Sequence, residues 1–330
     1  MSDKDKNEYL KKQEERFRQL SEKAEKNGED FKKVVVKGMK YKRLEPDYEN
    51  WLKECLKSSN WNGLNDLIFQ MNRHDLLPAC PSGYDHCWLF LSMLGAFACG
   101  DISAIERMFP RELGLTANGY PFYVVASNLL ISLWYNRETY HLSSTLRVGD
   151  RDKDEAMLTQ ALSKAEKFVT TKKPQWERAT VAYLLALHNK DVAEAQTQLQ
   201  EVCKSYMRID VSPAKKMLCV EAHGLYCLAY YLLPKEQYQQ LQMPDYKNFS
   251  IEYASWRREH PEPELHLYFE YPASMELVNQ IYLAPVAITK LHQPYLGQDN
   301  PYMSAREKKQ WNLDLEAMLD DFVAGMTGEK

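Results

Sequence analysis

The chain has 330 residues, of which 45% are hydrophobic and 27% charged, and its formal net charge is -4. These proportions are typical of an ordinary globular protein, and the length allows one large domain or two smaller ones. A domain that holds nucleic acid usually carries a basic excess, so the slight acidity argues mildly against that role.

Two features of the sequence bear on its location. The apolar runs over residues 88–99 and 123–135 are too short or too interrupted to span a bilayer. The first residues, Met-Ser-Asp-Lys-Asp-Lys, contain no apolar segment of the kind found in secretory signals. We therefore expect a cytoplasmic protein without membrane contact.

Residues 1–45 are highly charged, with both signs mixed. A thin apolar stripe over residues 6–27 predicts a solvated helix that packs loosely, and Gly28 ends it. The alternative is an arm that becomes ordered on a partner. The three valines at 34–36 favour a short extended piece.

From Pro46 onward, apolar residues recur at helical spacing between turns. This pattern predicts helices over residues 48–56, 61–71, 87–99, 102–109 and 123–135. Four further amphipathic helices follow, at about 154–169, 174–189, 192–207 and 213–233. The last is the most apolar and should be central. Short connections make successive helices antiparallel neighbours.

Three turns between the predicted helices are alike: Asn60-Trp61, Gly100-Asp101-Ile102 and Lys190-Asp191-Val192. Each places Asn or Asp where it can cap the next helix. Their spacing is not constant, so the chain is not a regular tetratricopeptide array. We predict an all-α fold, an irregular helical repeat or bundle of tetratricopeptide-like hairpins with a less regular C-terminal portion.

The composition changes after Pro234, where prolines and tyrosines become dense. We expect a short strand at 265–271, a helix at 275–291 with a kink or boundary near Pro285, and a last helix at 306–326. The sequence thus divides into three parts: a charged arm (1–45), a helical-repeat core (46–235) and a Pro/Tyr-rich portion packed on the core (236–330).

The residues that could carry chemistry form no known motif. The seven cysteines include no CxxC pair, and most lie on apolar helical faces, which is typical of reduced, buried thiols. Cys219 and His223 could form a nucleophile pair, but their apolar helix favours a structural role. His260 and His266 lie close in sequence, but the two prolines between them encode no common ligand geometry. We predict no catalytic, metal-binding or cofactor-binding residue.

Partner-binding residues are sought where aromatic or acidic side chains gather. Tyrosine and tryptophan are enriched at binding hot spots, which makes the aromatic region 246–302 a candidate surface. The alternative is that these rings pin an irregular segment onto the core. The acids of the last helix lie mostly on its polar side. The alternative to a partner site is that they form a solvated face. The predicted partner-binding residues are Tyr268, Glu270, Tyr271, Glu316, Asp320 and Asp321.

Several phrases between residues 48 and 233 resemble a known family. They are Gly-Ala-Phe-Ala-Cys-Gly-Asp at 95–101, Trp-Glu-Arg-Ala at 176–179, Ala-Leu-His-Asn-Lys-Asp at 186–191 and Glu-Ala-His-Gly-Leu at 221–225. The chain resembles the all-helical immunity proteins encoded beside bacterial polymorphic toxins, in particular the immunity protein 49 family. The resemblance implies a cytosolic, non-enzymatic bacterial protein that binds and blocks a cognate toxin.

Three functional hypotheses follow. The first is an immunity protein that neutralises a toxin by direct binding. The second is a tetratricopeptide-like adaptor, which predicts a groove lined by polar and aromatic side chains. The third is an all-helical enzyme, which requires a deep pocket with convergent His, Cys or carboxylate groups.

Overall fold

The computed structural model describes residues 3–41, 47–78, 85–108, 120–137, 151–298, 301, 303–304, 308–309 and 311–326. The described chain is all-α, as predicted, apart from one short antiparallel strand pair, β1 (Leu291–His292) with β2 (Asn312–Leu313). Among the described residues, no helix is both long and apolar enough to cross a membrane.

The helices in chain order are α1 (Asp3–Asn27), α2 (Phe31–Lys40), α3 (Tyr48–Ser58), α4 (Trp61–Asp75), α5 (Asp85–Cys99), α6 (Ile102–Met108), α7 (Pro121–Tyr135), α8 (Arg151–Val169), α9 (Gln175–His188), α10 (Val192–Tyr206), α11 (Pro213–Met217), α12 (Val220–Leu232), α13 (Lys235–Gln240), α14 (Ile251–Glu259), the short 3-10 helix η3 (Ala273–Met275), α15 (Glu276–Leu283) and α17 (Leu315–Met326).

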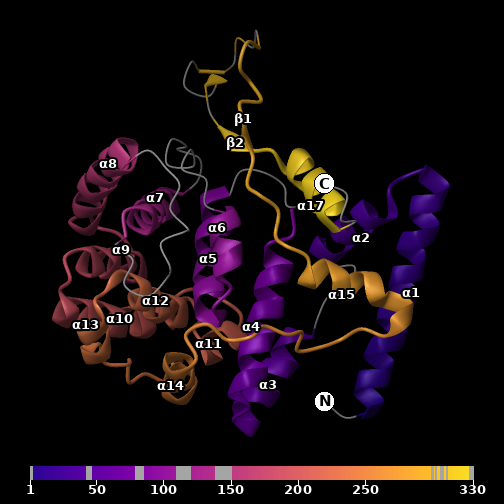
Figure 1. Ribbon diagram of the computed structural model, residues 1–330, viewed down its shortest axis with the longest axis horizontal. Helices are drawn as coiled ribbons and strands as arrows, with labels where there is room; N and C mark the ends of the chain where they lie inside the picture. The colour runs from indigo at the N-terminus through magenta and orange to yellow at the C-terminus, as the bar shows by residue number, and fades with distance from the viewer. Residues whose placement is uncertain are drawn as a thin grey trace.

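The helices form two groups on either side of α4 and α5 (Figure 1). α7 to α10, α12 and α13 lie on one side, and α1 and α2 lie on the other. Between them, α5 packs against both α4 and α12. α12 is buried on nearly all sides, which confirms its predicted central position. The buried core runs through all of these elements.

The three similar turns share one structure. Ser59, Gly100 and Lys190 each adopt a positive φ of 52°, 84° and 57° at the end of a helix. The next residue closes the helix by donating its N–H to a carbonyl five residues back, at 3.1, 2.9 and 3.0 Å. Its side chain then caps the following helix: Asn60, Asp101 and Asp191 accept N–H groups at 3.0, 3.2 and 3.0 Å. One residue therefore ends one helix and starts the next, which confirms the predicted capping.

This turn structure predicts opposite effects at two neighbouring serines. Ser59 pays the cost of a left-handed conformation, about 1 kcal/mol for a residue with a Cβ, so Ser59→Gly should raise the free energy of unfolding by up to about 1 kcal/mol. Ser58→Gly, one residue earlier in α3, should lower it, because glycine weakens a helix and the Ser58 hydroxyl bond to the Glu54 carbonyl (2.8 Å) is lost. Urea unfolding of both variants tests this prediction. If both substitutions changed the free energy of unfolding in the same direction, the assigned turn structure would be contradicted.

Several local predictions were wrong. Residues 34–36 are helical rather than extended, because Asp30 caps α2 by accepting the N–H groups of Lys32 and Lys33. The expected helix 213–233 is broken at Leu218–Cys219, where the Cys219 N–H donates to Asn248 instead of to the preceding turn (2.8 Å). The helix expected at 275–291 is shorter than that range: it ends at Leu283, at the boundary predicted near Pro285. The last helix begins only at Leu315; residues 306–307 and 310 lie outside the described part.

Residues 265–271 form no strand, because helix side chains satisfy their backbone. Gln70 of α4 exchanges two hydrogen bonds with Phe269, donating to its carbonyl at 3.0 Å and accepting from its N–H at 2.9 Å. The His266 N–H donates to Asp66, also on α4 (3.2 Å). Figure 1 shows this segment leaving α14, crossing the central helices and reaching α1 before the chain returns through α15. It therefore connects helices that are far apart in sequence.

Candidate functional site

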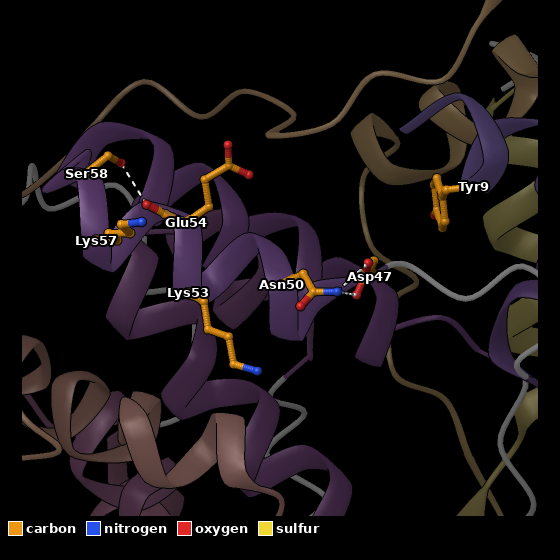
Figure 2. Close-up of a pocket in the computed structure, with 7 residues that line it drawn as sticks. All are labelled: Tyr9, Asp47, Asn50, Lys53, Glu54, Lys57 and Ser58. Carbon is orange, nitrogen blue, oxygen red and sulfur yellow. Dashed lines mark hydrogen bonds between the residues drawn. The ribbon is translucent and has the colours of Figure 1, made fainter. Parts of the chain in front are cut away.

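An open surface depression lies between α1 and α3 (Figure 2). It has a volume of ≈ 720 Å³ and is lined by Tyr9, Asp47, Asn50, Lys53, Glu54, Lys57 and Ser58. We call it the α1–α3 groove. Residues 47, 50, 54 and 57 are spaced three or four apart, so they share one face of α3. The opposite face of the helix buries Trp51, Leu52 and Cys55, so the amphipathic sequence of α3 creates the groove wall.

Tyr9 is held in place by aromatic contacts. Its ring packs edge-on against Trp51 at 5.9 Å and against Phe269 at 5.6 Å between centroids. Its hydroxyl lies 3.0 Å from the hydroxyl of Tyr271. Burial, followed by the neighbouring Tyr271, raises the pKa of Tyr9, so the phenol stays neutral at physiological pH. The N-terminal helix is thereby fixed to the 260–272 segment at the edge of the groove.

The groove carries both signs of charge. Lys53 pairs with Glu49 at 2.7 Å, and Asn50 donates to the two carboxylate oxygens of Asp47 at 3.1 and 2.9 Å. Lys57 makes no ion pair with any described residue. A mixed polar wall of this kind, with one aromatic ring, has the composition of the polar rim of a protein–protein interface rather than of its apolar centre.

A second open depression is less suited to a partner. It has a volume of ≈ 700 Å³ and lies between α10 and residues 242–245. Gln196 there donates to the Gln242 side chain at 2.9 Å, and the Gln200 side chain exchanges two hydrogen bonds with the Asp245 backbone, both 3.0 Å. Its amide groups thus satisfy one another, and its lining contains no aromatic ring.

The structure divides the tyrosines predicted to bind a partner. Tyr268 is half-buried, with its ring 5.8 Å from that of Trp51, and it lies beside Cys55 on α3. Tyr271 is only 4% exposed, because it packs against Tyr9, Phe269 and Tyr282. The Tyr271 side chain therefore packs the segment against the core, which is the alternative to partner binding that the sequence left open. Glu270 between them is exposed.

The three predicted acids of the last helix lie elsewhere. Glu316, Asp320 and Asp321 are exposed on α17. Asp320 pairs with Lys33 of α2 at 2.6 Å, and Asp321 pairs with Lys290 at 2.7 Å. In Figure 1, α17 lies on one side of α15 and the 260–272 segment on the other. Asp320 thus links α17 to α2 and Asp321 links it to Lys290, and the structure does not join these acids to the tyrosines.

Cys219 and His223 are both fully buried and do not act on each other. The His223 Nε2 accepts the N–H of Ser250 at 3.2 Å, and its ring stacks on Phe249 at 4.0 Å. Burial lowers the pKa of His223 to about 3 and raises that of the Cys219 thiol well above its usual value. A neutral imidazole and a protonated thiol are the unreactive forms of such a pair.

His223 should make stability depend on pH. Its pKa is near 6.5 in the unfolded chain and about 3 in the folded chain, so the unfolded state binds more protons below pH 6.5. Stability should therefore fall as pH falls, by about 2 kcal/mol from His223 between pH 6.5 and 5.

The variant His223→Gln keeps an acceptor for Ser250 but cannot titrate. Urea unfolding should show that the free energy of unfolding falls less between pH 7 and pH 5 in His223→Gln than in the wild type. His266→Gln, at an exposed histidine, is the control and should retain the wild-type loss. An unchanged pH dependence in His223→Gln would contradict the assigned burial.

The remaining histidine and cysteine candidates show no convergent site. In the described part of the chain, no group of three or more His, Cys, Asp or Glu side chains is arranged to hold a metal ion. His260 stacks on Trp256 at 4.6 Å, whereas His266 lies 3.6 Å from the exposed Glu264. The six described cysteines are free thiols, five of them buried and Cys87 half-buried. Cys80 lies outside the described residues.

Sequence inspection missed the groove residues because each is an ordinary polar residue on a helix. The sequence did predict which face of α3 is buried, and the groove residues lie on the remaining, polar face of that helix. The partner across the groove, Tyr9, lies in a segment expected to be loosely packed, and nothing in its local sequence indicates contact with residue 271.

A comparison of the chain with protein families, with curated proteins and with solved structures found no match. The class that the structure defines is therefore an all-helical protein with an open polar groove between its N-terminal helix and α3. Because a helical fold hosts many functions, the function must be argued from the groove itself.

Proposed function

We propose that this chain is a binding protein that holds a protein partner in the α1–α3 groove. The groove itself carries the proposal: a depression of ≈ 720 Å³ whose wall combines charged, amide and aromatic side chains. The residues that line it come from a regular helix and from an anchored tyrosine, so the free protein presents them in a fixed arrangement. Preorganised surfaces of this kind bind with a low entropic cost.

The more specific proposal is that the partner is a bacterial toxin, which the chain neutralises by direct contact. The sequence phrases that resemble those of helical immunity proteins support this choice. Such a role needs no catalytic residue, cofactor or metal.

The experiment is calorimetric titration of the full chain with the product of the neighbouring gene, together with a bacterial growth assay in which that product is toxic. We expect stoichiometric binding and restored growth. Lys57→Glu should weaken binding by about tenfold or more, since it reverses a charge in the groove. Lys164→Glu, on the exposed face of α8, is the matched control and should bind normally. Absence of binding would contradict the toxin proposal.

The adaptor hypothesis is the second candidate, and the same groove favours it, since its lining is polar and includes Tyr9. The two proposals differ in their partners. Capture on the tagged wild-type chain, repeated with Lys57→Glu, should give one partner for an immunity protein and several for an adaptor. If Lys57→Glu retains every partner at wild-type level, the groove is not the binding surface.

A further inference from the structure

A second site is indicated where α7, α9 and α10 meet. Five aromatic rings follow one another there, from the surface inward. The distance between the ring centroids is 6.3 Å for Tyr120 and Tyr123 and 4.8 Å for Tyr123 and Phe122. It is 4.9 Å for Phe122 and Trp176 and 5.9 Å for Trp176 and Tyr206. Tyr120 is 45% exposed and Tyr206 is 1% exposed, so the series leads from solvent to a buried end.

Two carboxylates flank this series of rings. Glu177 lies in the first turn of α9 and Glu221 in the first turn of α12, and both are buried. The Glu221 carboxylate is 3.8 Å from the Lys215 ammonium and 3.9 Å from the Cys219 thiol. Burial raises the pKa of Tyr123, and Cys87, Glu221 and Glu177 all raise it further, which places both carboxylates around this ring.

Three polar atoms of the cluster are buried without a partner. The indole N–H of Trp176, one carboxylate oxygen of Glu177 and the hydroxyl of Tyr206 make no hydrogen bond to any group of the protein. Each of these side chains is less than 8% exposed. Leaving a buried polar group without a hydrogen bond is costly, and native proteins rarely retain several such groups together without a use for them.

The chemistry of the cluster favours a positive charge. Aromatic faces attract cations, and the Glu177 oxygen and the Tyr206 hydroxyl are acceptors for an ammonium or guanidinium N–H. Lys173 already holds its ammonium 6.0 Å from the centre of the Tyr120 ring, so the exposed end of the series accommodates a cation. Within the cluster, Lys215 stands opposite Glu221, whereas the Glu177 carboxylate lies beside the Tyr120 hydroxyl and Lys173 and keeps one oxygen without a hydrogen bond.

We propose that the cluster of Tyr123, Trp176, Glu177, Tyr206 and Glu221 binds an organic cation, an alkylammonium or guanidinium group. The cation donates to Glu177 and Tyr206 and packs against the rings. The group belongs either to a small amine or to a lysine or arginine side chain of a partner. None of these residues lines the α1–α3 groove, so the proposal stands independently of the function proposed for that groove.

The experiment is calorimetric titration of the full chain with four probes: butylammonium chloride, arginine amide, a tripeptide with a central arginine and blocked ends, and sodium phosphate. We expect saturable binding of the cationic probes. An affinity at least tenfold higher for the tripeptide than for the free cations would assign the site to a partner side chain. Similar affinities would assign it to a small amine.

Two variants locate the binding. Glu177→Gln is nearly isosteric and should weaken the cationic probes by about 10- to 100-fold, the usual effect of losing one charge-assisted hydrogen bond. Glu236→Gln is the matched control: Glu236 also lies in a first helical turn after a proline cap but is exposed, and this variant should bind as the wild type does. Circular dichroism checks that both variants fold.

Three results would overturn the proposal. One is the absence of saturable binding for every cationic probe. Another is binding that Glu177→Gln leaves unchanged. The third is binding of phosphate in preference to the cations, which would show that Lys173, Lys215 and the Trp176 N–H form an anion site instead.

Discussion

Gly224→Ala is expected to destabilise the protein by about 1–2 kcal/mol, although alanine is the better helix former. A Cβ at this position in α12 would lie 2.0 Å from the carbonyl oxygen of Leu94 in α5. Because that oxygen belongs to a helix backbone, it cannot rotate away, and the two central helices must separate. Overpacking of this kind costs about 1–3 kcal/mol or more, which exceeds the gain of about 1 kcal/mol in helix propensity.

Gly325→Ala is the control, since Gly325 also lies in a helix but an added Cβ would meet no described atom within 4 Å. This substitution should leave stability unchanged or raise it by up to about 1 kcal/mol. Urea unfolding curves for both variants give the comparison. If Gly224→Ala proved as stable as the wild type, α5 and α12 would not touch at this point.

Asp101→Asn is expected to lose about 3 kcal/mol of stability. Asp101 is 1% exposed and accepts two hydrogen bonds from the buried Arg73 guanidinium, at 2.7 and 3.1 Å. Asparagine can still cap α6 through its one oxygen, as Asn60 caps α4, but the substitution removes the charge and replaces one of the two oxygens that accept from Arg73 with an NH2 donor. Arg73 is then left buried with an uncompensated charge, and breaking a buried pair typically costs about 3–5 kcal/mol.

Two further variants separate the ion pair from the cap. Asp191→Asn changes the same turn position where no buried arginine is present, so its effect on stability should be within about 0.5 kcal/mol. Arg73→Met combined with Asp101→Asn should recover part of the loss, because neither charge then remains buried. A loss at Asp191→Asn as large as that at Asp101→Asn would assign the effect to the cap rather than to the ion pair.

The local sequence was sufficient to predict those helices whose ends are set by residues at or next to the ends. The stretch 154–207 was predicted as three helices, and the structure contains α8, α9 and α10 there. Their limits follow from Pro174, from the Lys190–Asp191 turn and from periodic apolar residues, which act within a few positions of one another. The capping of α4, α6 and α10 could be predicted for the same reason.

Local sequence was insufficient where a distant group competes for the backbone. Cys219 donates to Asn248 instead of continuing a helix, and Phe269 pairs with Gln70 instead of with a strand. The valines at 34–36 have an extended preference, but the Asp30 cap and burial within the core set a helix. In each case, tertiary contact supplies more free energy than the local preference.

The sequence by itself determined the all-α class, the hairpin turns and the polar face of α3, because these depend on periodicity and capping over short distances. Only the tertiary structure decided which surfaces can act. It placed Tyr9 across from α3, buried Tyr271 and turned the α17 acids toward α2 and Lys290. It also brought Glu177 and Glu221 to one series of rings. Such contacts join residues tens to hundreds of positions apart, and helical periodicity shows which face of a helix is buried but not which other segment packs against it.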